Sequence, residues 1–285
     1  MDKFKIFAFA DEASSDLGEQ IDAMRRNGLQ GLELRSVDEI NVSDLTTAQA
    51  KEIRQRLDDA GLATWSIGSP IGKIDMDGDF AAHLEKYRRT LELANIFGAE
   101  NIRLFSFFIP DGKNPDDYES LVIDRLGQFA ELAAGTGVTV CHENEKDIYG
   151  DIAVRCEKIH RALPDVKAIF DPANFVQCGE DTLKAWEILK PYVKYLHIKD
   201  ALHNGNVVPA GKGDGNLQAL LEAYAAAGGR VMTLEPHLAV FSALGQIERH
   251  DRSHGVGAEY VYENNHAAFD AASTALRQLL EPISK

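Results

Sequence analysis

Residues 5–34 read KIFAFADEASSDLGEQIDAMRRNGLQGLEL, and this stretch contains one complete strand–helix–strand unit. It opens with a short apolar run that is typical of a buried strand. Leu17, Ile21 and Met24 then recur at helical spacing, and Gly28 is a typical helix stop. The last four residues return to a strand pattern. The stretch therefore predicts a βαβ unit, from which parallel sheets are built.

The same alternation continues to the end of the chain. The predicted strands span 5–10, 31–34, 63–68, 101–107, 138–143, 167–171, 193–199 and 230–235. The clearest helical patterns span 16–27, 47–60, 80–97, 118–134, 217–227 and 266–280. Strict alternation of this kind predicts an α/β protein with a closed (β/α)₈ TIM barrel. An open dinucleotide-binding sheet is the main alternative, and it is disfavoured because no Gly-rich turn follows the first strand.

The chain is expected to form one domain over residues 1–285, because this length lies within the range of a single barrel and no linker interrupts it. The longest irregular stretch, about 237–263, follows the eighth strand. Loops of that length more often cover a site or form an interface than merely connect elements.

Composition limits the classes of partner. The net charge is −15, which disfavours binding to a nucleic-acid backbone. No apolar stretch is long enough to span a bilayer, and no signal peptide is recognised. The three cysteines are odd in number and lack zinc-ribbon spacing, which favours a reduced compartment. We expect a cytoplasmic protein that acts on a small molecule, and a homo-oligomer is compatible with the acidic surface and the long loop.

Charged or imidazole side chains stand at the ends of the last four predicted strands. These residues are Glu143, Asp171, His197 and Glu235. Because the carboxyl ends of barrel strands meet at one mouth, we expect these side chains to converge. Three carboxylates and an imidazole would repel one another without a cation. The pattern predicts one divalent metal ion; oxygen ligands with one nitrogen favour Mn²⁺, Mg²⁺ or Co²⁺, and Zn²⁺ is also compatible.

Each of these residues also has a purely structural interpretation. A carboxylate at a strand end is often a helix N-cap, and Asp171 stands directly before Pro172, which is common at a first helical position. A lone His197 is more often a core histidine. Four such residues on successive strands are difficult to explain by capping alone, so the metal interpretation is favoured.

Other polar residues near these strand ends are candidates for the site. His142 is either a general base beside the metal or a partner that orients Glu143. Lys199 shares a strand face with His197 and either contacts substrate oxygens or forms a buried salt bridge. Lys212 lies in a Gly-rich loop whose amides either bind an anion or form a simple turn.

Three further candidates lie on or beside earlier strands, namely Glu33, Arg35 and Arg103. Each either binds substrate hydroxyls or belongs to the ordinary structure of a barrel.

Five segments together resemble the sugar phosphate isomerase/epimerase family of the xylose isomerase-like barrels. They are HENEK at 142–146, FDPAN at 170–174, LHIKD at 196–200, GKGDG at 211–215 and LEP at 234–236. The resemblance implies that the quartet of Glu143, Asp171, His197 and Glu235 holds the metal. It also implies that Glu143 and Glu235 move protons on opposite faces of the substrate.

Two positions depart from the ketose 3-epimerases that this family contains. Asn174 stands where they tend to carry a histidine, and His203 stands where they carry an arginine. These differences disfavour a free-ketose epimerase, although Asn174 is retained as a candidate substrate-binding residue. Related apurinic endonucleases bind three zinc ions through additional histidines, and Asn174 and the acidic net charge disfavour that activity too.

We therefore expect a metal-dependent sugar or sugar-phosphate isomerase or epimerase that works through an enediolate with two glutamate acid/bases. The alternative is a metal-dependent lyase or dehydratase that acts by β-elimination on an oxidised sugar, a 3-keto-glycoside or a cyclitol, with His142 as its base. A sugar-binding barrel without activity is a third hypothesis, and the intact quartet counts against it.

Overall fold

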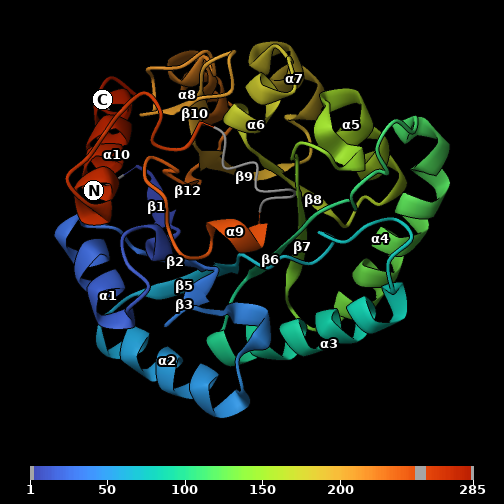
Figure 1. Cartoon of the computed structure of the whole chain (residues 1–285), viewed down its shortest axis with the longest axis horizontal. Coiled ribbons are helices and arrows are strands. Elements are labelled where there is room, and N and C mark those ends of the chain that lie inside the picture. The colour runs from blue at the N-terminus through green and yellow to red at the C-terminus, as the bar shows by residue number, and fades with distance from the viewer. Residues whose placement is uncertain (1–2, 248–254, 284–285) are drawn as a thin grey trace.

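The computed structural model describes residues 3–247 and 255–283 of the chain (Figure 1). Parallel strands close into a barrel in the order β1-β12-β9-β8-β7-β6-β5-β2. The barrel strands are β1 (Lys5–Ala8), β2 (Gly31–Leu34), β5 (Ala63–Ile67), β6 (Asn101–Leu104), β7 (Thr139–Glu143), β8 (Lys167–Phe170), β9 (Val193–Ile198) and β12 (Val231–Leu234). The predicted (β/α)₈ barrel and its eight strands are thus confirmed.

Most of the helices form a ring around these strands, whereas α9 lies over the middle of the view in Figure 1. The α-helices are α1 (Leu17–Arg26), α2 (Thr47–Asp59), α3 (Phe80–Phe97), α4 (Glu119–Ala133), α5 (Ala153–Ala162), α6 (Pro172–Gln177), α7 (Thr182–Leu189), α8 (Leu217–Ala226), α9 (Leu244–Ile247) and α10 (Asn265–Leu280). Short 3₁₀ turns are η1 (Ala10–Glu12), η2 (Val42–Asp44), η3 (Pro115–Tyr118) and η4 (Tyr149–Asp151). Two antiparallel ribbons, β3 (Ser36–Val37) with β4 (Ile40–Asn41) and β10 (Asp200–Ala201) with β11 (Val207–Val208), follow β2 and β9.

Local chemistry explains the first helix well. The Asp16 carboxylate accepts a hydrogen bond from the Glu19 backbone N–H at 2.9 Å and so caps the start of α1. The face predicted to be apolar, Leu17, Ile21 and Met24, is buried against the barrel. The helix stops before Gly28, whose positive φ of 59° favours glycine.

Strand alternation divides the strand residues into two sets. Val140, Phe170, Leu196 and Leu234 belong to the main core between the barrel and its helices. Inside the barrel, a second cluster consists of Phe7, Trp65, Cys141, Ile169 and Tyr195. Cys141 and Tyr195 lie two residues before Glu143 and His197, so this apolar layer lies directly beneath the polar strand ends.

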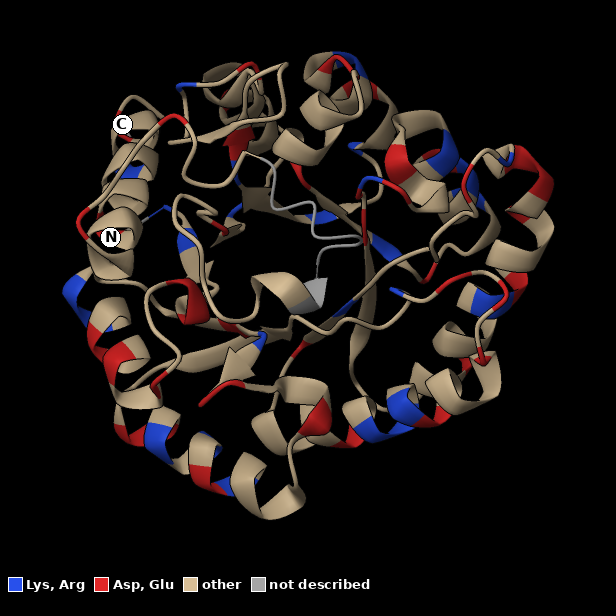
Figure 2. Cartoon of the chain, in the orientation of Figure 1, with Lys and Arg blue, Asp and Glu red and all other residues tan. Residues whose placement is uncertain are grey.

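Acidic and basic residues are distributed over the outer helices, and others lie at strand ends inside the ring (Figure 2). Among the described residues, no helix combines the length and the apolar character that crossing a membrane requires.

Two buried histidines away from the strand ends should make the fold sensitive to acid. The backbone N–H of Gly72 donates to His83 Nε2 at 2.8 Å, and His160 Nδ1 lies 3.0 Å from the carbonyl oxygen of Val166. Burial lowers the pKa of His83 and of His160 to about 4 in each case. Both imidazoles are therefore neutral in the folded protein at neutral pH.

The unfolded chain binds these protons near pH 6.5, so the free energy of unfolding should fall as the pH drops from 7 toward 4. We expect a loss of about 1–3 kcal/mol from each histidine. The free energy of unfolding is measured in urea for the His160→Gln and His83→Gln variants between pH 7 and 4.5. We expect it to depend less steeply on pH in each variant than in the wild type. Slopes equal to that of the wild type would contradict the assignment.

Candidate metal centre

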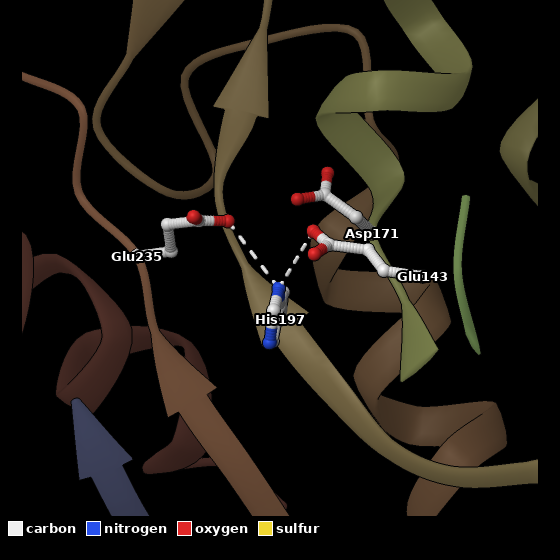
Figure 3. Close-up of side chains that lie close together, drawn as sticks. All are labelled: Glu143, Asp171, His197 and Glu235. Carbon is white, nitrogen blue, oxygen red and sulfur yellow. Dashed lines mark hydrogen bonds and ion pairs between the residues drawn. The ribbon is translucent and has the colours of Figure 1, made fainter. Parts of the chain in front are cut away.

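The four predicted ligands come together at the carboxyl end of the barrel (Figure 3). Glu143 ends β7, Asp171 follows β8, His197 lies in β9 and Glu235 follows β12. These four strands are neighbours in the barrel order, which is why their ends meet. One nitrogen or oxygen atom from each residue lies within 4.8 Å of the corresponding atoms of the others, and all four residues are buried.

His197 is held between carboxylates on both sides of its ring. Its Nδ1 lies 2.9 Å from Glu143 Oε1 and 3.3 Å from Glu235 Oε2. Its Nε2 lies 3.0 Å from Glu33 Oε2. Burial disfavours the charged ring, but the carboxylates of Glu143 and Glu33 outweigh burial and raise the pKa of His197 well above its ordinary value.

Glu33, for which the sequence left substrate binding or ordinary barrel structure open, contacts His197 in the structure. It is fully buried on β2, where Tyr195 Oη donates to its Oε1 at 2.9 Å and Ser66 Oγ does so at 3.3 Å. With a metal ion bound, a hydrogen bond from Nε2–H to Glu33 would leave Nδ1 as the ligand nitrogen.

Asp171 caps a helix and also belongs to the cluster. Its Oδ1 accepts from the Asn174 backbone N–H at 2.9 Å and caps α6, as the alternative interpretation predicted. Its Oδ2 lies 2.9 Å from Lys199 Nζ. Burial, together with the nearby Glu235 and Glu143, raises the pKa of Asp171 to about 7 despite Lys199.

Lys199 forms the buried salt bridge that was one of its two predicted roles. Its ammonium lies between Asp171 Oδ2 at 2.9 Å and Glu235 Oε2 at 3.2 Å. It contacts the same carboxylates that were predicted as metal ligands, and it also lines a small cavity at the mouth.

Two arginines hold the remaining oxygens of the glutamate pair. Arg103 Nη1 lies 3.0 Å from Glu143 Oε2, and Arg35 Nη1 lies 3.3 Å from Glu235 Oε1. Both guanidinium groups are buried. Each glutamate therefore directs one oxygen toward His197 and the other toward an arginine.

Asp11, Glu12 and His237 also belong to this centre, and the sequence analysis missed them as site residues. Arg35 pairs with both oxygens of Asp11 at 2.8 and 3.0 Å and with Glu12 Oε1 at 3.1 Å. Glu12 in turn accepts from the His237 backbone N–H, and burial raises the pKa of Glu12 to about 8. Asp11 and Glu12 directly follow the first strand, so the strand-end rule that found the quartet would have found them too.

Glu12, Glu235 and His237 form a second group of side chains with the geometry of a metal site. However, the Arg35 guanidinium contacts both carboxylates of that group. Protein cations thus contact both groups, since Lys199 and Arg103 contact the carboxylates of the quartet.

His142 is not brought to the cluster. Because strand residues alternate, its side chain lies on the opposite face of β7 from Glu143. Its Nε2 lies 2.9 Å from Ser106 Oγ, and its ring packs against His160. Burial lowers the pKa of His142 well below the ordinary value. The structure thus gives no support to a base at this position.

The Gly-rich loop near Lys212 binds a carboxylate of its own chain. Asp200 accepts hydrogen bonds from the backbone N–H groups of Gly211, Gly213 and Gly215 at 2.9, 2.9 and 3.0 Å. A Cβ at Gly213 would lie 2.4 Å from Asp200 Oδ1, which explains the glycine. Lys212 itself is exposed. The predicted anion site in this loop is therefore not supported.

Asn174 helps to join the ends of β7 and β8. Its Nδ2 donates to the carbonyl oxygen of Asn144 at 2.9 Å. Asn144 in turn exchanges two hydrogen bonds with the backbone of Asp171, each of 2.9 Å. This hydrogen bonding positions Asp171, and the Asn174 side chain also lines the cavity.

The cavity above the cluster is small, with a volume of about 20 Å³. Arg103, Lys199 and Glu235 line it from the barrel, and His237 and Val256 line it from the segment after β12. This volume is close to that of one water molecule. Two residues of the long segment predicted at about 237–263 thus line the cavity, and residues 248–254 of it lie outside the described residues.

The donor set fits a divalent cation. It offers carboxylate oxygens and one imidazole nitrogen, and the other nitrogen of that imidazole is already bound by Glu33. Hard and borderline ions such as Mg²⁺, Mn²⁺, Co²⁺ and Zn²⁺ accept such donors.

Comparison with solved structures supports the fold. An L-ribulose 3-epimerase is 20% identical with a TM-score of 0.74, over 99% of this chain and 95% of that one. The probable 3-DHS dehydratase AsbF from Bacillus anthracis is 17% identical with a TM-score of 0.72, over 97% and 99%. The IOLI protein, solved with a zinc atom, is 14% identical with a TM-score of 0.74, over 98% of each chain.

Comparison of the sequence with curated proteins gave no match. The family model described as xylose isomerase-like TIM barrel matches residues 21–254, which is most of the chain. With its closed barrel and its metal-type cluster at the strand ends, the chain belongs to the xylose isomerase-like TIM barrel family.

Proposed function

We propose that this chain is a divalent-metal-dependent isomerase or epimerase of a sugar or sugar phosphate, with Glu143 and Glu235 as its acid/base pair. The observation that carries the proposal is their placement. Figure 3 shows the two carboxylates on either side of His197, and each lies within 3.3 Å of its Nδ1. Carboxylates on two sides of one site suit the removal of a proton from one face and its return to the other.

The quartet would hold the ion, with His197 contributing Nδ1. A bound ion would polarise a substrate carbonyl group and stabilise the negative charge that develops when the neighbouring carbon loses a proton. Glu143 and Glu235 exchange protons with the substrate carbon through an enediolate intermediate. Arg103 and Arg35 each hold one oxygen of a carboxylate and so orient both groups.

Relatives of similar fold include both an epimerase and a probable dehydratase, so a lyase is the second candidate. This support is an analogy of fold. A lyase that uses His142 is disfavoured, because that side chain contacts Ser106 and not the cluster. A lyase at this site would take its base from a group at the mouth, such as Glu143 or Glu235.

The resident metal and the carbohydrate class are part of the proposal. Mn²⁺, Mg²⁺ or Co²⁺ suits the donors, and the zinc atom of the IOLI protein keeps Zn²⁺ among the candidates. A cytoplasmic location and a homo-oligomeric state also stay predictions.

Incubation in D₂O tests the function. The protein is stripped with a chelator, reloaded with Mn²⁺ and mixed with ketoses, ketose phosphates, 3-keto-glycosides and inososes. We expect metal-dependent deuterium incorporation at a carbon beside the carbonyl group, measured by NMR and mass spectrometry. The chelated protein is the control. Loss of water or of an aglycone would instead identify a lyase, and the absence of turnover on every compound would count against both.

A further inference from the structure

Aromatic rings and cations alternate in a column across the barrel mouth. The column runs in the order Phe241, Arg35, Phe9, Arg103, Phe105 and Lys73. The successive distances from cationic atom to ring centroid are 4.6, 4.3, 4.9, 4.9 and 4.4 Å. These separations lie within the range of cation–π attraction.

Phe9 is the ring that both arginines share. Arg35 Cζ lies 4.3 Å and Arg103 Cζ 4.9 Å from its centroid. These guanidinium groups contact Glu235 and Glu143 respectively. Phe9 therefore contacts each of the two arginines that hold the proposed acid/base residues.

The surroundings of Phe9 leave its ring little freedom. The side chain is fully buried, and its edge packs on His197 with ring centroids 5.3 Å apart at an angle of 84°. A Cβ at position 68 would lie 2.5 Å from Phe9 Cε1, so the ring depends on Gly68. The carbonyl oxygen of Gly68 also accepts from Arg103 Nη2 at 3.2 Å.

Two neighbouring guanidinium groups repel each other, and carboxylates hold each of them at its edge. An aromatic ring attracts both cations through its negative face and separates them with a rigid body. A leucine of similar apolar character gives neither the attraction nor the flat surface.

We propose that Phe9 is a positioning residue, which sets the places of Arg35 and Arg103 and through them the carboxylate oxygens of Glu235 and Glu143. Its effect on catalysis rests on the proposed function. Its effect on the carboxylate positions does not, and bound Mn²⁺ reports those positions without any substrate.

The test compares Phe9→Leu with Phe129→Leu. Phe129 on α4 is also fully buried, but it packs against Phe80, Tyr87 and Phe107. The Phe129→Leu variant therefore controls for the loss of a buried ring. Mn²⁺ is titrated by calorimetry, the EPR spectrum of bound Mn²⁺ is recorded, and folding is monitored by circular dichroism.

We expect Phe9→Leu to weaken Mn²⁺ binding about 10-fold and to change its EPR line shape. Phe129→Leu should leave both as in the wild type. The effect of Phe9→Leu should also shrink in an Arg103→Lys background, since both changes act on the same carboxylate. If the Leu variant does not fold, Phe9→Met replaces it.

Wild-type Mn²⁺ affinity and line shape in a folded Phe9 variant would overturn the proposal, as would equal changes in Phe129→Leu. Neither result touches the proposed function, which the D₂O experiment tests separately. Conversely, elimination products in D₂O would end the epimerase proposal and leave the positioning role intact.

Discussion

Replacing Glu143 with Gln is expected to lower turnover by about 10²–10⁴-fold at saturating Mn²⁺. The amide can still receive the hydrogen bond from Arg103, but it cannot remove a proton from carbon. Steady-state rates on the substrate found in D₂O measure the loss. Glu235→Gln should cause a loss of similar size, because the second carboxylate must return the proton.

Asp171→Asn provides the matched control for that prediction. Asn is as good an N-cap as Asp, so α6 keeps its capping hydrogen bond while the cluster loses one negative ligand. We expect weaker Mn²⁺ binding and, once the metal saturates, a smaller loss of turnover than in Glu143→Gln. Full turnover in Glu143→Gln would remove that residue from the acid/base pair.

The second large effect is expected at Glu33, which is buried behind His197. Glu33→Gln should weaken Mn²⁺ binding about 10–100-fold, because the neutral amide oxygen accepts the hydrogen bond from His197 Nε2–H more weakly than the carboxylate does. Calorimetric titration of the chelator-stripped protein measures the change.

Glu145→Gln is the control for Glu33→Gln. Glu145 is a carboxylate of low exposure that pairs with Lys73 at 3.2 Å, and it is outside the quartet. The Glu145→Gln variant should bind Mn²⁺ with nearly the affinity of the wild type. Comparable losses in both variants would show that general charge, and not the hydrogen bond to His197, controls the affinity.

The quartet was accessible from the sequence because it needs only local information. An apolar run of strand length that ends in Glu143 or Asp171 places that side chain at the barrel mouth, whatever the rest of the chain does. The position of His142 follows from the same alternation, since adjacent strand residues face opposite ways. Treating it as a base beside the metal or as a partner of Glu143 neglected that period of two.

Other parts of the site depend on contacts that no local pattern encodes. β2 and β9 are separated in the barrel by β1 and β12, so the hydrogen bond between Glu33 and His197 crosses the interior. The sequence of the Gly-rich loop is compatible with anion binding. Only the fold shows that Asp200 already accepts hydrogen bonds from the backbone N–H groups of this loop. The ribbons β3–β4 and β10–β11 have two-residue strands, which are too short to show any periodicity.

In the closed barrel, one half carries the quartet and the other half carries residues that surround it. The strands that carry the quartet, β7, β8, β9 and β12, are contiguous, whereas Phe9, Glu33, Arg35 and Arg103 lie on or just after strands of the other half. Under the proposed function, substitutions in the first half of the chain would change the surroundings of the two glutamates while every proposed ligand stays in place. Such a barrel would alter its reaction through the residues around the ion and not through the ion's own ligands.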